Sequence, residues 1–108
     1  MNIPEPRFAK VAAMIGDPTR ARMLSALIDG RFVAAGELAA AAGVTAQTAS
    51  GHLARLVDAE LLVLRAQGRH RYYRLADAEI AHALEALSLV AERRAGSDKW
   101  KQGGYRPL

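Results

Sequence analysis

Side chains that can bond to nucleic-acid bases gather in one short segment, residues 45–55. Glutamine can pair with N6 and N7 of adenine, and arginine can pair with O6 and N7 of guanine. Serine and threonine hydroxyls more often reach phosphates, which position a protein without specifying sequence. The candidate contact residues are Thr45, Gln47, Thr48, Ser50, Gly51, His52 and Arg55. They predict contact with DNA, and an ordinary solvated helix face is the alternative.

A basic run follows at residues 65–74 and contains four arginines, one histidine and no acidic residue. On a hairpin, such a run favours phosphate binding over a merely solvated surface. Because side chains alternate along a strand, we expect Arg69 and Arg71 to share one face, with Arg65 near them. Arg74 is expected to point the other way and to pair with an acid. Phosphate contacts are therefore predicted for Arg65, Arg69 and Arg71.

The composition of the whole chain agrees with a polyanion-binding protein. The 108 residues carry a net charge of +4. Hydrophobic residues make up 51% of the chain and charged residues 24%, which is typical of one globular domain. We expect that domain to span residues 1–96 and a mobile tail to occupy residues 97–108. The absence of cysteine excludes disulfides and thiolate metal sites within the chain.

Localisation and catalysis are also constrained by the sequence. The N-terminus lacks a signal-peptide pattern and no apolar run reaches membrane-spanning length, so we expect a cytoplasmic protein without a membrane partner. No catalytic nucleophile, phosphate loop or metal-ligand cluster stands out. We therefore predict that the protein is not an enzyme and has no cofactor.

The elements that must position the candidate contacts follow from hydrophobic periodicity and turn residues. Helices are predicted over residues 6–15, 18–28, 34–42, 46–57 and 78–94, with strands over residues 61–67 and 70–75. Two short helices joined by a tight turn and followed by a hairpin form a winged helix-turn-helix. The predicted fold class is thus mainly α with a small β-hairpin: four helices, two strands and a last helix.

Individual residues define where these elements begin, end and pack. The predicted N-caps are Asp17, Thr45 and Asp77. Gly43 is expected to take a positive φ and end the third helix. The buried stripe of the fourth helix is predicted at Ala49, Leu53 and Leu56. Tyr72 and Tyr73 are expected to pack against the core rather than stack on bases.

The first and last helices carry apolar stripes that are long for a chain of this size. The residues concerned are Phe8, Val11, Ile15, Ile80, Leu84, Leu87 and Ala91. These stripes could cover the core of their own domain. A homodimer through the same helices would bury them and place two DNA-reading helices one DNA turn apart, roughly 34 Å. We predict the homodimer.

Four stretches in the same order and spacing resemble the ArsR/SmtB family of bacterial winged helix-turn-helix repressors. They are Gly16–Arg22, Gly36–Ala39, Val44–Leu53 and Gly68–Leu75. The resemblance covers about residues 7–94. It implies a homodimer, held by the first and last helices, that binds a DNA operator and leaves it when a signal arrives.

The sequence departs from the family at its metal-binding positions. Ala34 and Gly36 stand where the soft-metal members carry cysteines, and neither can hold a metal. At the second family site the corresponding residues include Val90 and Arg93, which cannot serve either. His82 and Glu85 have a helical spacing that can hold a metal, but a solvated pair is favoured. The resemblance therefore implies a member without a metal cofactor and with an unidentified inducer.

Two further departures concern the backbone. Gly51 stands where relatives often have arginine and costs the helix about 1 kcal/mol against alanine. It either admits close approach of the backbone to DNA or has no role. Glu60 stands where relatives often have glycine, so an unfavourable backbone or a different turn is expected there.

We interpret the chain as a dimeric, sequence-specific transcriptional repressor that binds double-stranded DNA. The first alternative is a winged-helix protein-interaction module without specific DNA binding, against which the basic hairpin argues. The second alternative keeps DNA binding and adds a metal or small-molecule sensor built from other residues.

Overall fold

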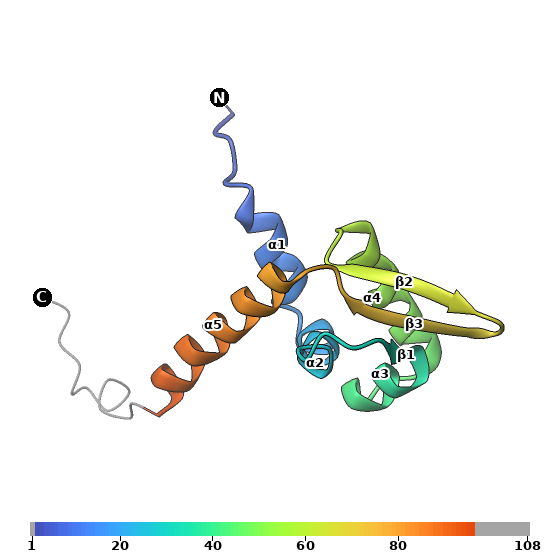
Figure 1. Cartoon of the computed structure of the whole chain (residues 1–108). Coiled ribbons are helices and arrows are strands. Elements are labelled where there is room, and N and C mark those ends of the chain that lie inside the picture. The colour runs from blue at the N-terminus through green and yellow to red at the C-terminus, as the bar shows by residue number, and fades with distance from the viewer. Residues whose placement is uncertain (1, 97–108) are drawn as a thin grey trace, which may run out of the picture.

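The computed structural model describes residues 2–96, and the tail predicted at residues 97–108 lies outside them. The elements are α1 (Phe8–Ile15), α2 (Pro18–Ala26), β1 (Val33–Ala34), α3 (Ala35–Ala42), α4 (Ala46–Asp58), β2 (Leu62–Gln67), β3 (His70–Leu75) and α5 (Ala78–Ala95). The predicted winged helix-turn-helix is confirmed, with α3 and α4 as the helix-turn-helix and β2–β3 as the wing (Figure 1).

All three predicted N-caps are present and fix where α2, α4 and α5 begin. The Asp17 carboxylate accepts the backbone N–H of Arg20 at 3.0 Å, and Pro18 occupies the first turn of α2. The Thr45 hydroxyl accepts the N–H of Thr48 at 3.1 Å. The Asp77 carboxylate accepts the N–H of Ile80 at 3.1 Å. Each bond satisfies a backbone donor that the first helical turn leaves free.

The helix-turn-helix ends both of its helices in the same way. Gly43 has a φ of 70°, as predicted, and turns the chain from α3 toward α4. Glu60 has a φ of 63° after α4, so the expected unfavourable backbone is found at this position. Left-handed backbone costs a residue with a Cβ roughly 1–2 kcal/mol. The tertiary structure must therefore hold Glu60 in place.

The sheet has a third strand that the sequence pattern does not predict. Its antiparallel order is β1-β3-β2, with Val33 opposite Tyr73 and Ala34 opposite Tyr72. β1 has only two residues, too few for an alternating pattern, and helical periodicity places Ala34 at the start of α3 instead. The strand ties the segment before α3 to the wing.

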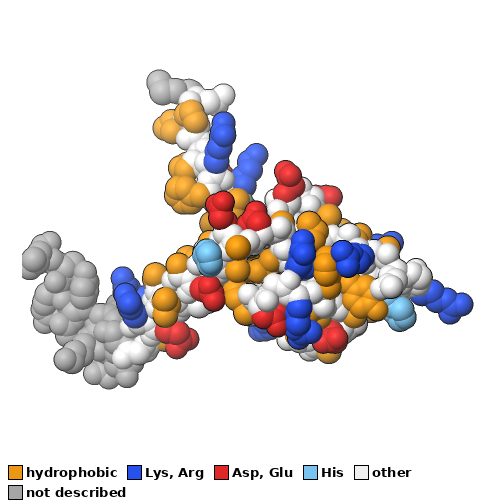
Figure 2. All heavy atoms as spheres, viewed as in Figure 1, with side chains coloured by type: hydrophobic (Ala, Val, Ile, Leu, Met, Phe, Trp, Pro, Cys, Tyr) orange, Lys and Arg blue, Asp and Glu red, His pale blue; other side chains and the backbone are white. Residues whose placement is uncertain are grey.

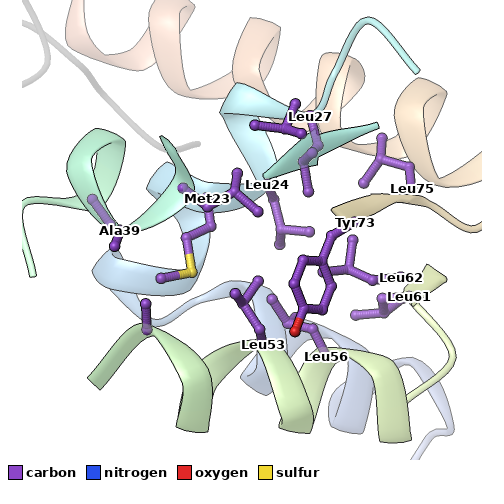
Figure 3. Packing of buried hydrophobic residues seen from close by; sticks show 14 residues of the cluster. Met23, Leu24, Leu27, Ala39, Leu53, Leu56, Leu61, Leu62, Tyr73 and Leu75 are labelled. Carbon is purple, nitrogen blue, oxygen red and sulfur yellow. The ribbon is translucent and has the colours of Figure 1, made fainter. Parts of the chain in front are cut away.

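The core lies between α2, α3 and α4 on one side and the inner face of the sheet on the other. Met23 and Leu24 from α2 and Leu27 just after it belong to one buried cluster with Leu53 and Leu56 from α4 (Figure 3). The predicted α4 stripe, which also includes Ala49, is buried as expected. Burying this stripe leaves the opposite, polar side of α4 for solvent.

The two predicted tyrosines of β3 differ in their surroundings. Tyr73 is 4% exposed and belongs to the core. Tyr72 is half-buried on the outer face of the sheet, opposite Arg65 in the β2–β3 register. The prediction that both pack against the core is therefore wrong for Tyr72, because neighbouring residues of a strand point to opposite faces.

Two elements, α5 and the β2–β3 hairpin, extend away from this core. α5 and the β2–β3 hairpin leave the body in opposite directions (Figure 1). No residue of α5 is fully buried. Within residues 2–96, every helix is too short or too polar to cross a lipid bilayer.

Candidate nucleic-acid interface

The exposed side of α4 brings most of the predicted base and phosphate contacts together. A shallow hollow of about 350 Å³ is lined by Gln47, Thr48, Gly51, His52 and Arg55. Ser50 is also exposed but lies outside this hollow. A convex helix that carries amides, hydroxyls and a guanidinium on its free side matches the donors and acceptors of a major groove.

Thr45 and Thr48 form a small hydroxyl cluster where α4 begins. The Thr45 hydroxyl accepts the Thr48 backbone N–H and donates to the Thr48 hydroxyl oxygen at 3.1 Å. Thr45 thus has a structural role besides the predicted DNA contact. Both residues remain exposed beside the first turn of the helix, where backbone N–H groups attract phosphate oxygens.

A β-carbon added to Gly51 would meet no other atom within 4 Å, so the folded chain itself does not require glycine there. The residue is exposed on the wall of the α4 hollow. Both explanations therefore stay open: close approach of the backbone to DNA, or no role for the glycine.

His52 differs from the other predicted contacts because it is half-buried. Its Nδ1 lies 3.2 Å from Nη1 of Arg20 on α2. The sequence pattern does not single out Arg20, since nothing in the spacing of residues 20 and 52 indicates that they meet. One nitrogen of the His52 ring is therefore engaged within the protein.

The β2–β3 register separates the predicted wing arginines. Arg65 pairs with Tyr72 and Arg71 pairs with Ala66, so Arg65 and Arg71 lie on opposite faces of the hairpin. Arg69 belongs to the two-residue turn, where strand alternation does not decide its direction. The expected position of Arg65 near Arg69 and Arg71 is therefore not on the face of the hairpin that carries Arg71. All three side chains are exposed, and basic side chains reach the far end of the hairpin (Figure 2).

Phe32, which the sequence pattern also does not single out, organises the outer face of the sheet. Its ring centroid lies 4.4 Å from Cζ of Arg65 and 4.8 Å from Cζ of Arg74. The expected acidic partner of Arg74 is thus replaced by an aromatic ring. A guanidinium over a ring face gains electrostatic attraction without losing its charge. Phe32 therefore restrains two cations at the base of the wing.

Two carboxylates near this surface are held in their charged form by neighbouring donors. The backbone N–H of Arg20 lowers the pKa of Asp17 below its usual 3.8. The backbone N–H of Arg31 and then its guanidinium, 2.8 Å away, lower the pKa of Asp29 in the same sense. Arg31 and Asp29 therefore form an exposed ion pair.

A second surface, distant from the wing, is apolar. An open groove of about 990 Å³ runs between α1, α2 and α5, and its lining includes Ala12, Ile15, Ala21, Ile28, Leu84 and Leu87. We call it the α1–α5 groove. Leu87 of the groove is 51% exposed, and on α1 Phe8 is 73% and Val11 45% exposed.

The predicted dimer residues do not all lie in the same environment. Ile15, Ile80 and Leu84 are half-buried and pack partly against the core of their own chain. Phe8, Val11, Leu87 and Ala91 are exposed. The alternative, in which the apolar stripe covers the core of its own chain, thus holds for the first part of α5. The later part of α5 remains exposed.

The described part of the chain contains no group of three or more His, Asp or Glu side chains arranged to hold a metal ion. His82 is exposed on α5. The pair His82 and Glu85 therefore lacks a third ligand among residues 2–96.

The family model described as a helix-turn-helix domain matches residues 15–65. The chain is 46% identical over 88 residues to YdfF, an HTH-type transcriptional regulator of Bacillus subtilis, covering 82% of this chain and 39% of that protein. It is 41% identical over 86 residues to the HTH-type transcriptional regulator CmtR of Mycobacterium tuberculosis, covering 80% of this chain and 72% of CmtR.

Solved structures agree with these sequence relationships. The NMR structure of CmtR, described as a cadmium metal-sensor, has a TM-score of 0.61 and 42% identity, with 73% of this chain and 81% of that chain covered. A homodimeric winged helix-turn-helix domain from Mycobacterium bovis, described as a possible ArsR-family regulator, has a TM-score of 0.64 and 26% identity. The match covers 85% of this chain and 91% of that chain. The chain belongs to the ArsR/SmtB family of DNA-binding winged helix-turn-helix transcriptional regulators.

Proposed function

We propose that the protein acts as a homodimeric transcriptional repressor that binds a two-fold symmetric operator. The observation that carries this proposal is the placement of two surfaces: the polar α4 hollow beside a basic wing, and the uncovered apolar α1–α5 groove elsewhere on the molecule. A two-fold axis through the groove would bury the apolar side chains and present two α4 helices to successive turns of DNA.

Most of the predicted contacts have a role that follows from their chemistry. Gln47 and Arg55 read base edges in the major groove. Hydroxyl groups and the wing arginines bind phosphates and set the register of the protein on the duplex. The phosphate contacts are assigned to Thr45, Thr48, Ser50, Arg65, Arg69 and Arg71. Gly51 lets the backbone of α4 approach the DNA.

The signal that releases the operator does not act through the metal positions of the family. Ala34, Gly36 and Val90 have no ligating atoms, and the charge of Arg93 repels a cation. CmtR is described as a cadmium sensor, so the two proteins would differ in their inducer. We assign the protein a regulatory rather than an enzymatic role and a place in the cytoplasm, supported by relatives that are transcriptional regulators.

Selection of DNA fragments from the genome that encodes the protein tests this function directly. We expect recovery of fragments that share an inverted repeat and that bind more tightly than random DNA of the same length. The affinity should fall steeply with salt, about a thousandfold for a fourfold rise if the dimer neutralises six phosphates. Equal affinity for selected and random fragments would instead favour the interaction-module alternative.

A further inference from the structure

Arg20 connects three elements of the fold through hydrogen bonds from one guanidinium. Its Nε donates to the carbonyl oxygen of Met14 at 2.6 Å, and Nη2 donates to that of Ala13 at 3.4 Å. Its Nη1 lies 3.2 Å from Nδ1 of His52. The side chain therefore starts on α2, closes the last turn of α1 and reaches the DNA-facing helix α4.

The chemistry of this contact determines the state of the His52 ring. A guanidinium stays protonated and offers only donors, so Nδ1 must accept the hydrogen bond. In the neutral ring the proton is then carried by Nε2. Because His52 also lines the α4 hollow, Nε2–H is the polar group that the ring can offer to a ligand there.

We propose that Arg20 is a positioning residue for DNA recognition, which holds His52 as the Nε2–H tautomer so that it donates to an acceptor atom of the DNA. This inference rests on the proposed function. Arg20 itself makes no phosphate contact, because its donors are directed at two carbonyl oxygens and an imidazole within the protein.

The same bonds relate His52 to the proposed dimer surface. Met14 and Ala13 belong to α1, and the neighbouring residues Ala12 and Ile15 line the α1–α5 groove. A shift of α1 relative to α2 would move the carbonyl oxygens that hold Arg20 and thereby release His52. Arg20 thus bonds to both α1 and the α4 residue His52.

A double-mutant cycle on DNA affinity tests the proposal. In the wild-type background, Arg20→Leu should weaken binding to the selected operator about tenfold. In the His52→Ala background the same substitution should cause no further loss, because the ring that Arg20 positions is already absent. Additive losses would overturn the proposal, since Arg20 would then act independently of His52.

Arg22→Leu is the matched control for charge, since Arg22 lies on the same helix and is exposed. It should change affinity little. Arg20→Leu should leave the salt dependence of binding unchanged, whereas removal of a direct phosphate contact would lower the slope by about one for each phosphate no longer bound, thus by about two for both copies of the proposed dimer. A lowered slope would therefore contradict the proposal.

Nitrogen NMR of the His52 ring gives a readout that needs no DNA and that a general loss of stability does not mimic. In the neutral ring of the folded wild-type protein we expect the proton on Nε2. In folded Arg20→Leu, and more weakly in Arg20→Lys, the Nδ1–H form should gain population. Identical ring signals in all three proteins would overturn the proposal. If the wild type shows no preference for selected DNA, the proposed function fails, but the ring signals still decide whether Arg20 sets the tautomer.

Discussion

Two helix ends of the helix-turn-helix have the same hydrogen-bond pattern but different residues at the left-handed position. After α3, the N–H groups of Gly43 and Val44 donate to the carbonyl oxygens of Ala40 and Ala39. After α4, Glu60 and Leu61 donate in the same way to Val57 and Leu56. Both are Schellman motifs, and only the first has the glycine that this motif favours.

Introducing glycine at the second position and removing it from the first should change the free energy of unfolding in opposite directions. We expect Glu60→Gly to raise the free energy of unfolding by about 0.5–1 kcal/mol, because it relieves left-handed strain but adds unfolded-state entropy. Gly43→Ala should lower it by about 1 kcal/mol. Denaturant unfolding measures both. A loss of stability in Glu60→Gly would mean that the glutamate side chain outweighs its backbone strain.

The Asp17 cap should make stability depend on acid. Its folded pKa lies below the usual 3.8, so the charged cap stabilises the fold at neutral pH. That contribution should disappear as the pH falls through 3.8 and then through the lower folded pKa. Asp17→Asn, which can still cap, should flatten this part of the unfolding profile. Asp17→Ala should flatten it too and also destabilise α2 at neutral pH. An unchanged profile in Asp17→Asn would contradict the prediction.

Sequence reasoning at the residue scale succeeded where the controlling contact is local. The caps at Asp17, Thr45 and Asp77 each bond to a backbone N–H three residues ahead, so a short pattern contains all the information. The Arg20–His52 contact joins residues 32 positions apart. Such contacts depend on how α2 and α4 pack, which no short pattern specifies.

Among the elements, the wing makes the clearest electrostatic prediction. Arg69 in the turn and Arg71 in β3 are exposed at the end of the hairpin. If each binds a phosphate, Arg69→Ala or Arg71→Ala should each lower the slope of log affinity against log salt by about one for every phosphate no longer bound. Arg31→Ala is the control, because the charge of Arg31 is already paired with Asp29. Equal slopes in all variants would mean that the wing does not touch the DNA backbone.

Element prediction was accurate where a pattern extends over several residues. The strand His70–Leu75 was found with its observed bounds, and α4 differs from the prediction by one residue at its end. β1 was missed because two residues cannot show alternation, and Phe32, which directly precedes it, was therefore not placed beside the sheet. Its contact with Arg65 and Arg74 also changes the expected geometry of the wing.

At the scale of the whole molecule, the fold separates the surface proposed for DNA from the surface proposed for a second copy. The hairpin and α5 extend in opposite directions from the core (Figure 1). A single α4 helix covers only a few base pairs, so one chain has little surface for specific binding. Two linked copies gain affinity because the second binding event becomes intramolecular, by a factor of about 10² to 10⁴.

A charge placed in the α1–α5 groove should therefore affect assembly first and DNA binding as a consequence. Leu87 lines the groove and is 51% exposed, so Leu87→Glu should leave the single-chain fold intact. In the proposed dimer the same glutamate would be buried without a partner, which is strongly unfavourable. We expect sedimentation to show a monomer and operator affinity to fall at least about a hundredfold.

Leu64→Glu provides a control with the same change of side chain on β2, where Leu64 is 42% exposed and lies outside the groove. It should leave the sedimentation behaviour of the wild type unchanged. A Leu87→Glu protein that remains dimeric would show that the copies associate through another surface. A wild-type protein that sediments as a monomer would remove the two-fold arrangement of α4 helices and, with it, the reason to expect an inverted repeat in the operator.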